Sequence, residues 1–324
     1  MSAAAEVRRG DRFALFWGGG LGDVMVARPL LMALAARLEH RPYFFTTASH
    51  LEGLFEALGL DVELHVLPSA PGEALRRFRS LEVKFDWIYL GPRPRIKTRM
   101  LARIVGAKRI WSVRHADTDP FLGDQILADV RALGLAGTDP RTALPYGGDW
   151  GPPAPPSHGP YLVLHAGAKG RWETKQWPEQ KWTTLLDRLL DTTGMELLLV
   201  GTPAERSMLE ASVQGRGARV RVQTGFSLPE LAASLRGSRG VICHNSGVMH
   251  LAALLGKPTV VLTGSSPRHW RPPYAHVLNL DSGRCGLACD QYRCPVPFYH
   301  ARCIRELDVE TVMHAVQARL LGNP

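Results

Sequence analysis

The sequence predicts an α/β protein made of two doubly wound, Rossmann-like domains that face a central cleft. Short apolar segments of strand length alternate with segments whose apolar residues recur at helical spacing. One stretch rich in proline and glycine divides the 324 residues, and the alternation restarts beyond it. We therefore expect domains at 1–150 and 151–324, with a ligand bound where the carboxyl ends of the strands converge.

The first domain begins with the apolar run Phe13–Trp17, which Gly18-Gly19-Gly20 ends before a helical pattern runs from Val24 to Leu38. Further strands are predicted at Tyr43–Thr46, Leu64–Leu67 and Trp87–Leu90. Further helices are predicted around Leu51–Leu58, Leu75–Arg79 and Leu122–Leu133. This order of strand, tight turn and helix favours a parallel sheet covered by helices.

The stretch Gly147–Pro160 holds five Pro and four Gly in 14 residues, a composition that continues neither a helix nor a central strand. We interpret it as the interdomain linker. Beyond it, strands are predicted at Tyr161–His165, Leu197–Val200, Val220–Gln223, Val241–Cys243 and Thr259–Leu262. Helices are predicted at Trp177–Thr193, Ala204–Val213, Leu228–Arg236, Met249–Leu255 and Val309–Leu321. The last of these could pack back on the first domain.

Composition narrows the cellular location and the partners. No apolar run approaches the roughly 18 residues that span a bilayer, and the N-terminus lacks the apolar core of a secretory signal, so we expect a cytoplasmic protein. The net charge of +9 favours anionic partners. Between Gly91 and Arg114 the chain carries eight Lys or Arg and no acid.

Asp23 follows the first glycine-rich turn. A dinucleotide fingerprint that starts at Gly18 and Gly20 would need a third Gly where Asp23 stands, and no Walker A, HExxH or GxSxG motif occurs. A simple dehydrogenase or P-loop NTPase is therefore disfavoured. The Asp23 carboxylate is either a helix cap or a general base that faces the cleft.

Two segments of the second domain suit an anionic ligand. His165-Ala166-Gly167-Ala168 ends a strand in small residues and leads through Lys169, Arg171 and Lys175 to Trp177-Pro178. These cations either bind a diphosphate or are solvated surface charge. The run from His244 to Ala253 links a strand to an apolar helix, so its backbone amides form an anion site unless Asn245 or Ser246 merely caps the helix.

Five motifs follow one another along the chain: Gly20-Leu21-Gly22-Asp23 with Pro29, Lys175-Gln176-Trp177-Pro178, Asn245-Ser246-Gly247-Val248-Met249-His250, Gly256-Lys257-Pro258, and Thr263-Gly264. Together they resemble the heptosyltransferase family of glycosyltransferases, over about residues 13 to 305. The resemblance implies a GT-B fold with acceptor bound by the first domain and donor by the second. It also implies ADP-heptose as donor, the inner core of lipopolysaccharide as acceptor, and inversion at the anomeric carbon.

The resemblance also assigns residues. Asp23 matches the general base, Lys175 the lysine on the donor phosphates, and Glu205 the acid on the ribose hydroxyls. The remaining donor-binding positions are Gly22, Asn245, Ser246, Gly247 and His250. Many members have Asp where this chain has Asn245, and the loop before Lys175 is slightly long, which leaves Lys169 as the alternative lysine. No metal is required for transfer, because a lysine and a helix N-terminus neutralise the leaving diphosphate.

The basic run supplies Arg93, Arg95 and Arg99 for an anionic glycolipid acceptor, or for peripheral contact with the inner face of the membrane; a solvated helix face is the alternative. We expect no nucleic acid partner. Three other functions stay open: a nucleotide-sugar epimerase of similar fold, a sensor with a decayed site, and a heptosyltransferase that acts on a protein or a secondary metabolite.

Four of the five cysteines, Cys285, Cys289, Cys294 and Cys303, fall within 19 residues at C-x₃-C-x₄-C-x₈-C spacing. Disulfides are disfavoured in a reducing compartment, so the cluster predicts a structural zinc or iron that staples a loop, with ordinary packed thiols as the alternative. The fifth, Cys243, is interpreted as a small buried hydrophobe inside a strand.

Overall fold

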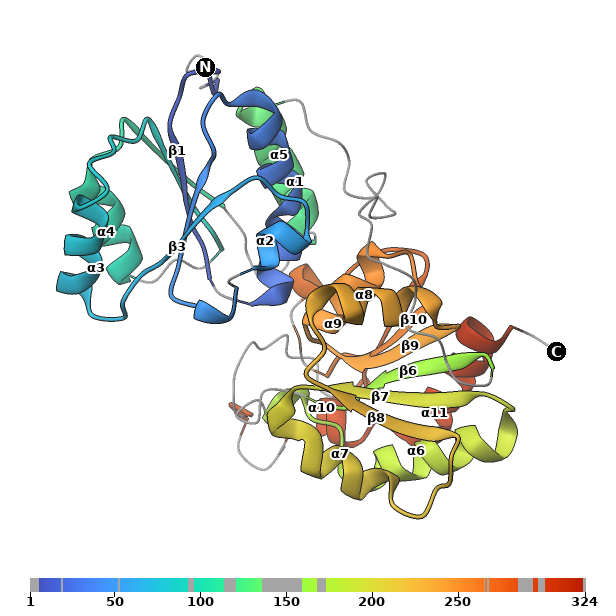
Figure 1. Ribbon diagram of the computed structural model, residues 1–324. Coiled ribbons are helices and arrows are strands. Elements are labelled where there is room, and N and C mark those ends of the chain that lie inside the picture. The colour runs from blue at the N-terminus through green and yellow to red at the C-terminus, as the bar shows by residue number, and fades with distance from the viewer. Residues whose placement is uncertain are drawn as a thin grey trace. The chain divides into compact units, whose positions relative to one another are not determined.

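The computed structural model describes residues 6–18, 20–51, 53–92, 96–113, 121–135, 159–167, 173–264, 266, 268–284, 294–296 and 301–322. The chain divides into two compact units, Met1–Ala143 and Leu144–Pro324, here called unit 1 and unit 2. Most of the predicted linker lies outside the described residues, which include only its last two positions, Gly159 and Pro160. Each unit is an α/β sandwich around its own parallel sheet (Figure 1).

Unit 1 contains a five-stranded parallel sheet in the order β3-β2-β1-β4-β5. Its strands are β1 Phe13–Phe16, β2 Tyr43–Thr46, β3 Glu63–Val66, β4 Trp87–Leu90 and β5 Arg109–Ser112. In the central register Phe16 lies between Phe45 of β2 and Leu90 of β4. The strand order reverses direction between β1 and β4, which makes the carboxyl ends of these two strands the topological switch point of unit 1.

Helices cover both faces of this sheet: α1 Leu21–Arg37, α2 Leu54–Ala57, α3 Pro71–Arg79, α4 Ile96–Val105 and α5 Leu122–Ala132. Helices α1 and α5 pack together on one face, and α3 and α4 on the other (Figure 1). Phe78 of α3 packs against Phe16 and Phe45 of the sheet, and the three ring centroids lie 4.9 to 5.9 Å apart. These aromatic contacts explain why the short strands β1 and β2 are completely buried.

Unit 2 contains a six-stranded parallel sheet in the order β11-β10-β9-β6-β7-β8, which is the Rossmann strand order. Its strands are β6 Tyr161–His165, β7 Glu196–Gly201, β8 Val220–Thr224, β9 Gly240–His244, β10 Thr259–Leu262 and β11 Val277–Leu280. The switch point here lies between β6 and β9, where Leu164 pairs with Ile242 and His165 with Cys243. Cys243 is completely buried within β9, as its prediction as a small core residue requires.

The helices of unit 2 are α6 Glu179–Thr192, α7 Arg206–Val213, α8 Leu228–Gly237, α9 Gly247–Leu254, α10 Arg302–Arg305 and α11 Val309–Val316. Helices α8 and α9 lie on one face of the sheet, and α6, α7 and α11 on the other (Figure 1). The last helix continues through a π-helical turn, Gln317–Leu321, and its side chains Val312, Val316 and Leu320 join the core of unit 2. Its described packing is therefore with unit 2.

The structure adds four helices and strands that the sequence pattern missed, namely α4, β5, β11 and α10. It also divides the predicted helix around 51–58 into a 3-10 turn, Ser49–Leu51, and α2. Helix α1 begins at Leu21, three residues before the predicted start, so that Asp23 lies inside its first turn. None of the helices within the described ranges is long and apolar enough to cross a membrane.

Candidate functional site

Two histidines end the neighbouring strands at the switch point of unit 2. His165 is the last residue of β6, and His244 is the last residue of β9. Because the carboxyl ends of parallel strands meet at one edge of the sheet, the loops that follow these residues converge there. The two loops lead to Gly167 and to the segment Asn245-Ser246-Gly247, both of which the sequence analysis singled out.

His244 connects the loops around this edge. Its Nε2 accepts the backbone N–H of Trp177 at 3.0 Å, and its Nδ1 lies 3.4 Å from the carbonyl oxygen of Gly167. The ring can satisfy both groups only with its proton on Nδ1. Complete burial, together with the nearby His165, lowers the pKa of His244 to about 3, so the neutral ring is the stable form at neutral pH.

Trp177 and Gly264 hold the segment that carries Lys175. The indole N–H of Trp177 donates to the carbonyl of Leu307 at 2.8 Å, and its ring meets Trp182 edge to face. Gly264 has φ +57°, and a Cβ there would lie 2.7 Å from the carbonyl oxygen of Thr174. The 3-10 turn Glu173–Lys175, which lies between β6 and α6 in the chain, is therefore fixed from both sides.

Lys175 lies close enough to His250 for its charge to act on the imidazole. His250 lies in α9 and is only 5% exposed. Burial, with the charge of Lys175 as a second cause, lowers the pKa of His250 to about 3. The site therefore holds a cationic lysine beside a neutral histidine, whose ring nitrogens can donate to or accept from an oxygen-rich ligand.

Ser246 occupies the N-cap of α9, but its side chain makes no capping hydrogen bond. Its Oγ lies instead 3.4 Å from Nδ1 of His165. By contrast, Ser227 caps α8 and Asp308 caps α11 through their side chains. The first-turn amides of α9, starting with Gly247, are thus left without a capping side chain and form a positive helix end suited to an anion.

Asn245 precedes this helix end and is 9% exposed. Within the part of the chain that the structure describes, its amide Nδ2 has no hydrogen-bond partner. A buried amide donor without a partner costs free energy, which an acceptor oxygen on a bound ligand would recover. The Nδ2 group of Asn245 is therefore available to donate to an acceptor oxygen of a ligand.

Glu205 is oriented by a capping box at the end of β7. Its Oε2 accepts from the backbone N–H of Thr202 at 2.7 Å and from the Thr202 hydroxyl at 2.8 Å. The carboxyl group lies against Gly167, where any Cβ would overlap it. Its charge also opposes the effect of burial on His165, whose pKa is lowered on balance. With Oε2 engaged, Oε1 is the oxygen placed to accept a hydroxyl.

Asp23 and Gly22 belong to unit 1, in the first turn of α1 at that unit's switch point. Gly20 is the N-cap residue and Asp23 the third helical residue, so Asp23 is not the N-cap. Its carboxylate folds back over the glycine turn, since a Cβ at Gly20 would lie 2.7 Å from Oδ2. The chain thus places this carboxylate at the carboxyl end of β1.

The remaining predicted residues divide between described and undescribed parts of the chain. Arg99 is exposed on α4, whereas Arg93 and Arg95 lie outside the described residues. Cys285 and Cys289 also lie outside them, while Cys294 donates its thiol to the carbonyl of Val296 at 3.6 Å and Cys303 is buried in α10. No group of three potential metal ligands occurs among the described residues.

Sequence reasoning did not assign His165, His244 and Gly264. A sequence signal existed for the histidines, because a polar residue that directly ends a buried strand is placed at the ligand-binding edge of a parallel sheet. Gly264 belongs to the Thr263-Gly264 motif that carried the resemblance, but nothing in the sequence indicated its contact with Thr174, ninety residues earlier in the chain.

The gathered groups suit a nucleotide diphosphate. A lysine and uncapped helix amides attract phosphates, and the Glu205 carboxylate, in the turn that follows β7, can accept hydroxyl groups such as those of a ribose. Two doubly wound units with such a site in the second define the GT-B class of glycosyltransferase fold.

Solved structures show the same fold. A family 9 glycosyl transferase from Veillonella parvula superposes with a TM-score of 0.72 at 21% identity and covers 98% of both chains. The E. coli heptosyltransferase WaaC with ADP gives a TM-score of 0.65 at 18% identity and covers 95% of this chain and 99% of that one.

Sequence comparison identifies the family. Residues 141–300 match the family model described as glycosyltransferase family 9 (heptosyltransferase). Lipopolysaccharide heptosyltransferase 1 of Pseudomonas aeruginosa is 35% identical over 105 residues, which are 32% of this chain and 29% of that protein, so the aligned stretch spans less than a third of the relative. The predicted resemblance is confirmed: the chain carries a domain of the heptosyltransferase family of glycosyltransferases.

Proposed function

We propose that the protein is an inverting glycosyltransferase that moves a heptose from ADP-heptose to a hydroxyl of the lipopolysaccharide inner core, in the cytoplasm at the inner face of the membrane. The observation that carries the proposal is the N-terminus of α9, which lies at the switch point of unit 2 and has no capping side chain. His250, in the first turns of the same helix, lies near Lys175. ADP is supported as the nucleotide because WaaC, which shares this fold, was solved with ADP.

Unit 2 would hold the donor. Lys175 and the amides that follow Ser246 neutralise the diphosphate, Asn245 donates its orphan amide hydrogen to an oxygen of the donor, and Oε1 of Glu205 accepts a ribose hydroxyl. As the sugar leaves, negative charge grows on the diphosphate, where a fixed lysine and helix end stabilise it without solvent reorganisation. We therefore propose that transfer needs no metal.

Unit 1 would supply the base and the acceptor site. Inversion requires the acceptor oxygen to attack the anomeric carbon from the face opposite the diphosphate while a base removes its proton. Asp23 is the carboxylate at the switch point of unit 1, and the basic segment with Arg93, Arg95 and Arg99 follows β4, the neighbouring strand at the same edge. Phosphates and carboxylates of a glycolipid core would bind these arginines.

A transfer assay tests the proposal. Purified protein is incubated with ADP-heptose and a lipopolysaccharide core fragment, and the product is analysed by mass spectrometry and by NMR for its anomeric configuration. We expect an acceptor heavier by one heptose residue and inverted at the anomeric carbon. Lys175→Ala should weaken ADP binding and slow transfer more than Lys169→Ala does. An epimerase would alter the donor without acceptor, and a sensor would bind it without turnover; either result contradicts the proposal.

A further inference from the structure

One face of helix α4 exposes large apolar side chains. Ile96 is 77% exposed, Met100 56% and Ile104 54%, values that exceed those of the other exposed large hydrophobics in the described residues, Ile110 and Met208. Side chains four residues apart lie one above the other on a helix, so Ile96, Met100 and Ile104 form one continuous row, here called the α4 stripe. Burying such a row would remove a substantial apolar area from water.

The α4 stripe is not part of the core of unit 1, because a different face of α4 packs against that core. Ala102 is completely buried in the core of unit 1, and Leu101 and Val105 pack against the same cluster. The helix is therefore apolar on two faces, one turned to the sheet and one to solvent. A surface helix normally has one apolar face, so the second indicates a partner outside unit 1.

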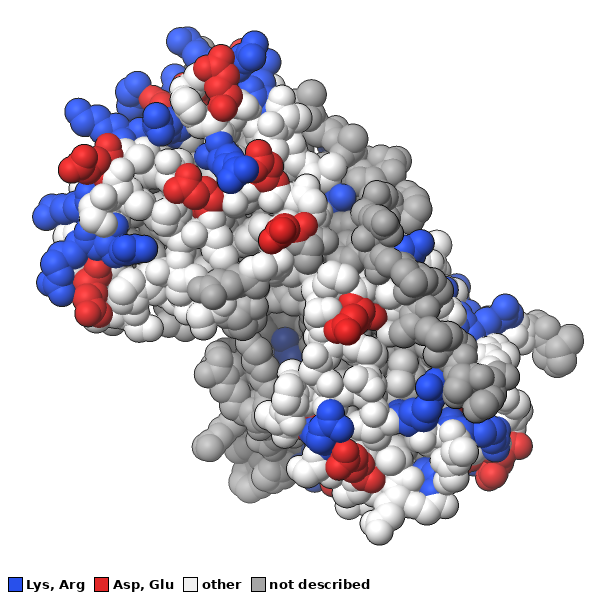
Figure 2. Space-filling model, viewed as in Figure 1, with Lys and Arg blue, Asp and Glu red and all other residues white. Residues whose placement is uncertain are grey.

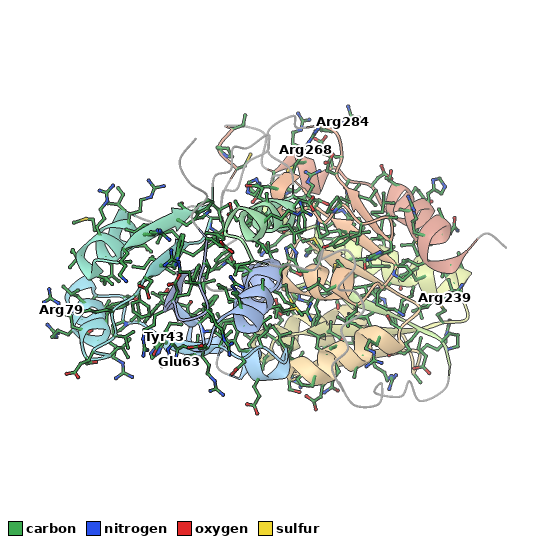
Figure 3. The ribbon with its side chains drawn as sticks, turned by 90° about the horizontal axis from the view of Figure 1, so that it is seen from above. Tyr43, Glu63, Arg79, Arg239, Arg268 and Arg284 are labelled. Carbon is green, nitrogen blue, oxygen red and sulfur yellow. The ribbon has the colours of Figure 1, made fainter. Side chains whose placement is uncertain are left out.

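Arginines border the α4 stripe. Arg99 and Arg103 are exposed one turn apart beside it, and within the described part of the chain neither forms an ion pair or side-chain hydrogen bond. Helix α3 packs against α4 and exposes Arg76, Arg77 and Arg79. Figure 2 shows basic side chains, with a few acidic ones among them, at the edge of unit 1 that carries these helices, and Figure 3 shows Arg79 pointing outward from α3.

We propose that the α4 stripe and its bordering arginines dock the protein on an anionic lipid bilayer. The stripe would enter the boundary between headgroups and acyl chains, and the arginines would contact lipid phosphates. Charge complementarity favours a bilayer over another protein surface, since residues 91–113 contain no acid that would orient a mixed-charge partner. At ten residues, α4 is about 15 Å long and would lie along the membrane surface. The proposal names the docking surface for the membrane location proposed above.

Vesicle flotation tests it with variants of the full chain. One variant removes the stripe (Ile96→Ser, Met100→Ser and Ile104→Ser), and a second removes charge (Arg99→Ser and Arg103→Ser). Met208→Ser on α7 is the matched control, because it removes an exposed apolar side chain from unit 2. Each protein is measured with vesicles of phosphatidylglycerol and phosphatidylethanolamine, and with vesicles of phosphatidylcholine, at low and high salt, after its thermal unfolding is compared with the wild type.

We expect the wild type to bind the anionic vesicles and to release them as salt rises. The stripe variant should bind about tenfold more weakly at every salt concentration, and the arginine variant should lose its preference for anionic lipid. Met208→Ser should bind like the wild type. The proposal is overturned if the wild type ignores anionic vesicles, if the folded stripe variant binds them equally well, or if the stripe instead sustains a dimer that its removal dissociates.

The experiment distinguishes failure of the proposed docking surface from failure of the proposed transferase function. With an acceptor fragment that lacks acyl chains, the stripe variant should transfer heptose at the wild-type rate. Absence of transfer by every protein, including the wild type, would contradict the proposed function while the vesicle measurement still decides the docking surface.

Discussion

Replacing Gly264 by alanine should disturb donor binding through the Lys175 segment. The φ of +57° costs an alanine about 1–2 kcal/mol, and its Cβ would lie 2.7 Å from the Thr174 carbonyl oxygen, about 0.7 Å short of ordinary contact. Relief of that overlap against backbone costs about 1–3 kcal/mol more and moves the residue next to Lys175. We therefore expect Gly264→Ala to lose about 2–5 kcal/mol of unfolding free energy and to raise the donor KM about tenfold.

Gly215→Ala is the matched control, because Gly215 has φ +81° and open space where its Cβ would go. It carries the backbone cost alone, about 1–2 kcal/mol, with donor kinetics unchanged. Urea unfolding gives the stability of each variant, and saturation kinetics with ADP-heptose give its KM. The reasoning is refuted if Gly264→Ala is no less stable than Gly215→Ala, or if both keep the wild-type donor KM.

Three further predictions follow from the site. Glu205→Gln should raise the donor KM about tenfold or more, because it loses a charge-assisted hydrogen bond to the donor. Glu230→Gln, which weakens the equivalent capping box on α8, should leave the donor KM unchanged in the same saturation kinetics with ADP-heptose. The pKa of His250 is about 3 in the folded chain and 6.5 in the unfolded chain, so between these pH values only the unfolded chain binds the proton. The free energy of unfolding should therefore fall as pH drops from 6.5 to 3, by up to about 1.4 kcal/mol per pH unit. His250→Gln should remove this part of the pH dependence, as measured by urea unfolding at a series of pH values. Elemental analysis of protein purified without chelator should find about one zinc or iron per chain, and Cys289→Ser should lose both the metal and stability. Metal-free protein of full stability would identify the four clustered cysteines as ordinary thiols.

The buried strands were the most predictable part of the fold. The predicted bounds of Tyr43–Thr46, Trp87–Leu90, Tyr161–His165 and Thr259–Leu262 agree with the structure because each strand is an almost wholly apolar run between polar or turn residues. Helix α4 was not predicted, because its stripe and its core face together obscure the single apolar face by which a helix is recognised.

Within the site, prediction succeeded where function depends on local sequence and failed where it depends on distant contacts. The residues from Asn245 to His250 lie together on one turn and one helix, so a motif was sufficient to identify them. The role of His244 required knowing that Trp177, 67 residues earlier, donates to its ring. Such a contact is set by the packing of α6 and β9 around the sheet and leaves no periodic pattern in the chain.

The division of labour between the two units is tested most directly by measuring transfer and ADP affinity together in Asp23→Asn. Asp124→Asn is the control, since α5 begins with the same Leu-Gly-Asp sequence as α1 and places Asp124 in the same turn of its helix. We predict that Asp23→Asn lowers the transfer rate by about 10²–10⁴-fold while its calorimetric Kd for ADP equals that of the wild type and of Asp124→Asn. Transfer within about threefold of the wild type, or a parallel loss of ADP binding, would contradict the assignment of the base to unit 1 and of the donor to unit 2.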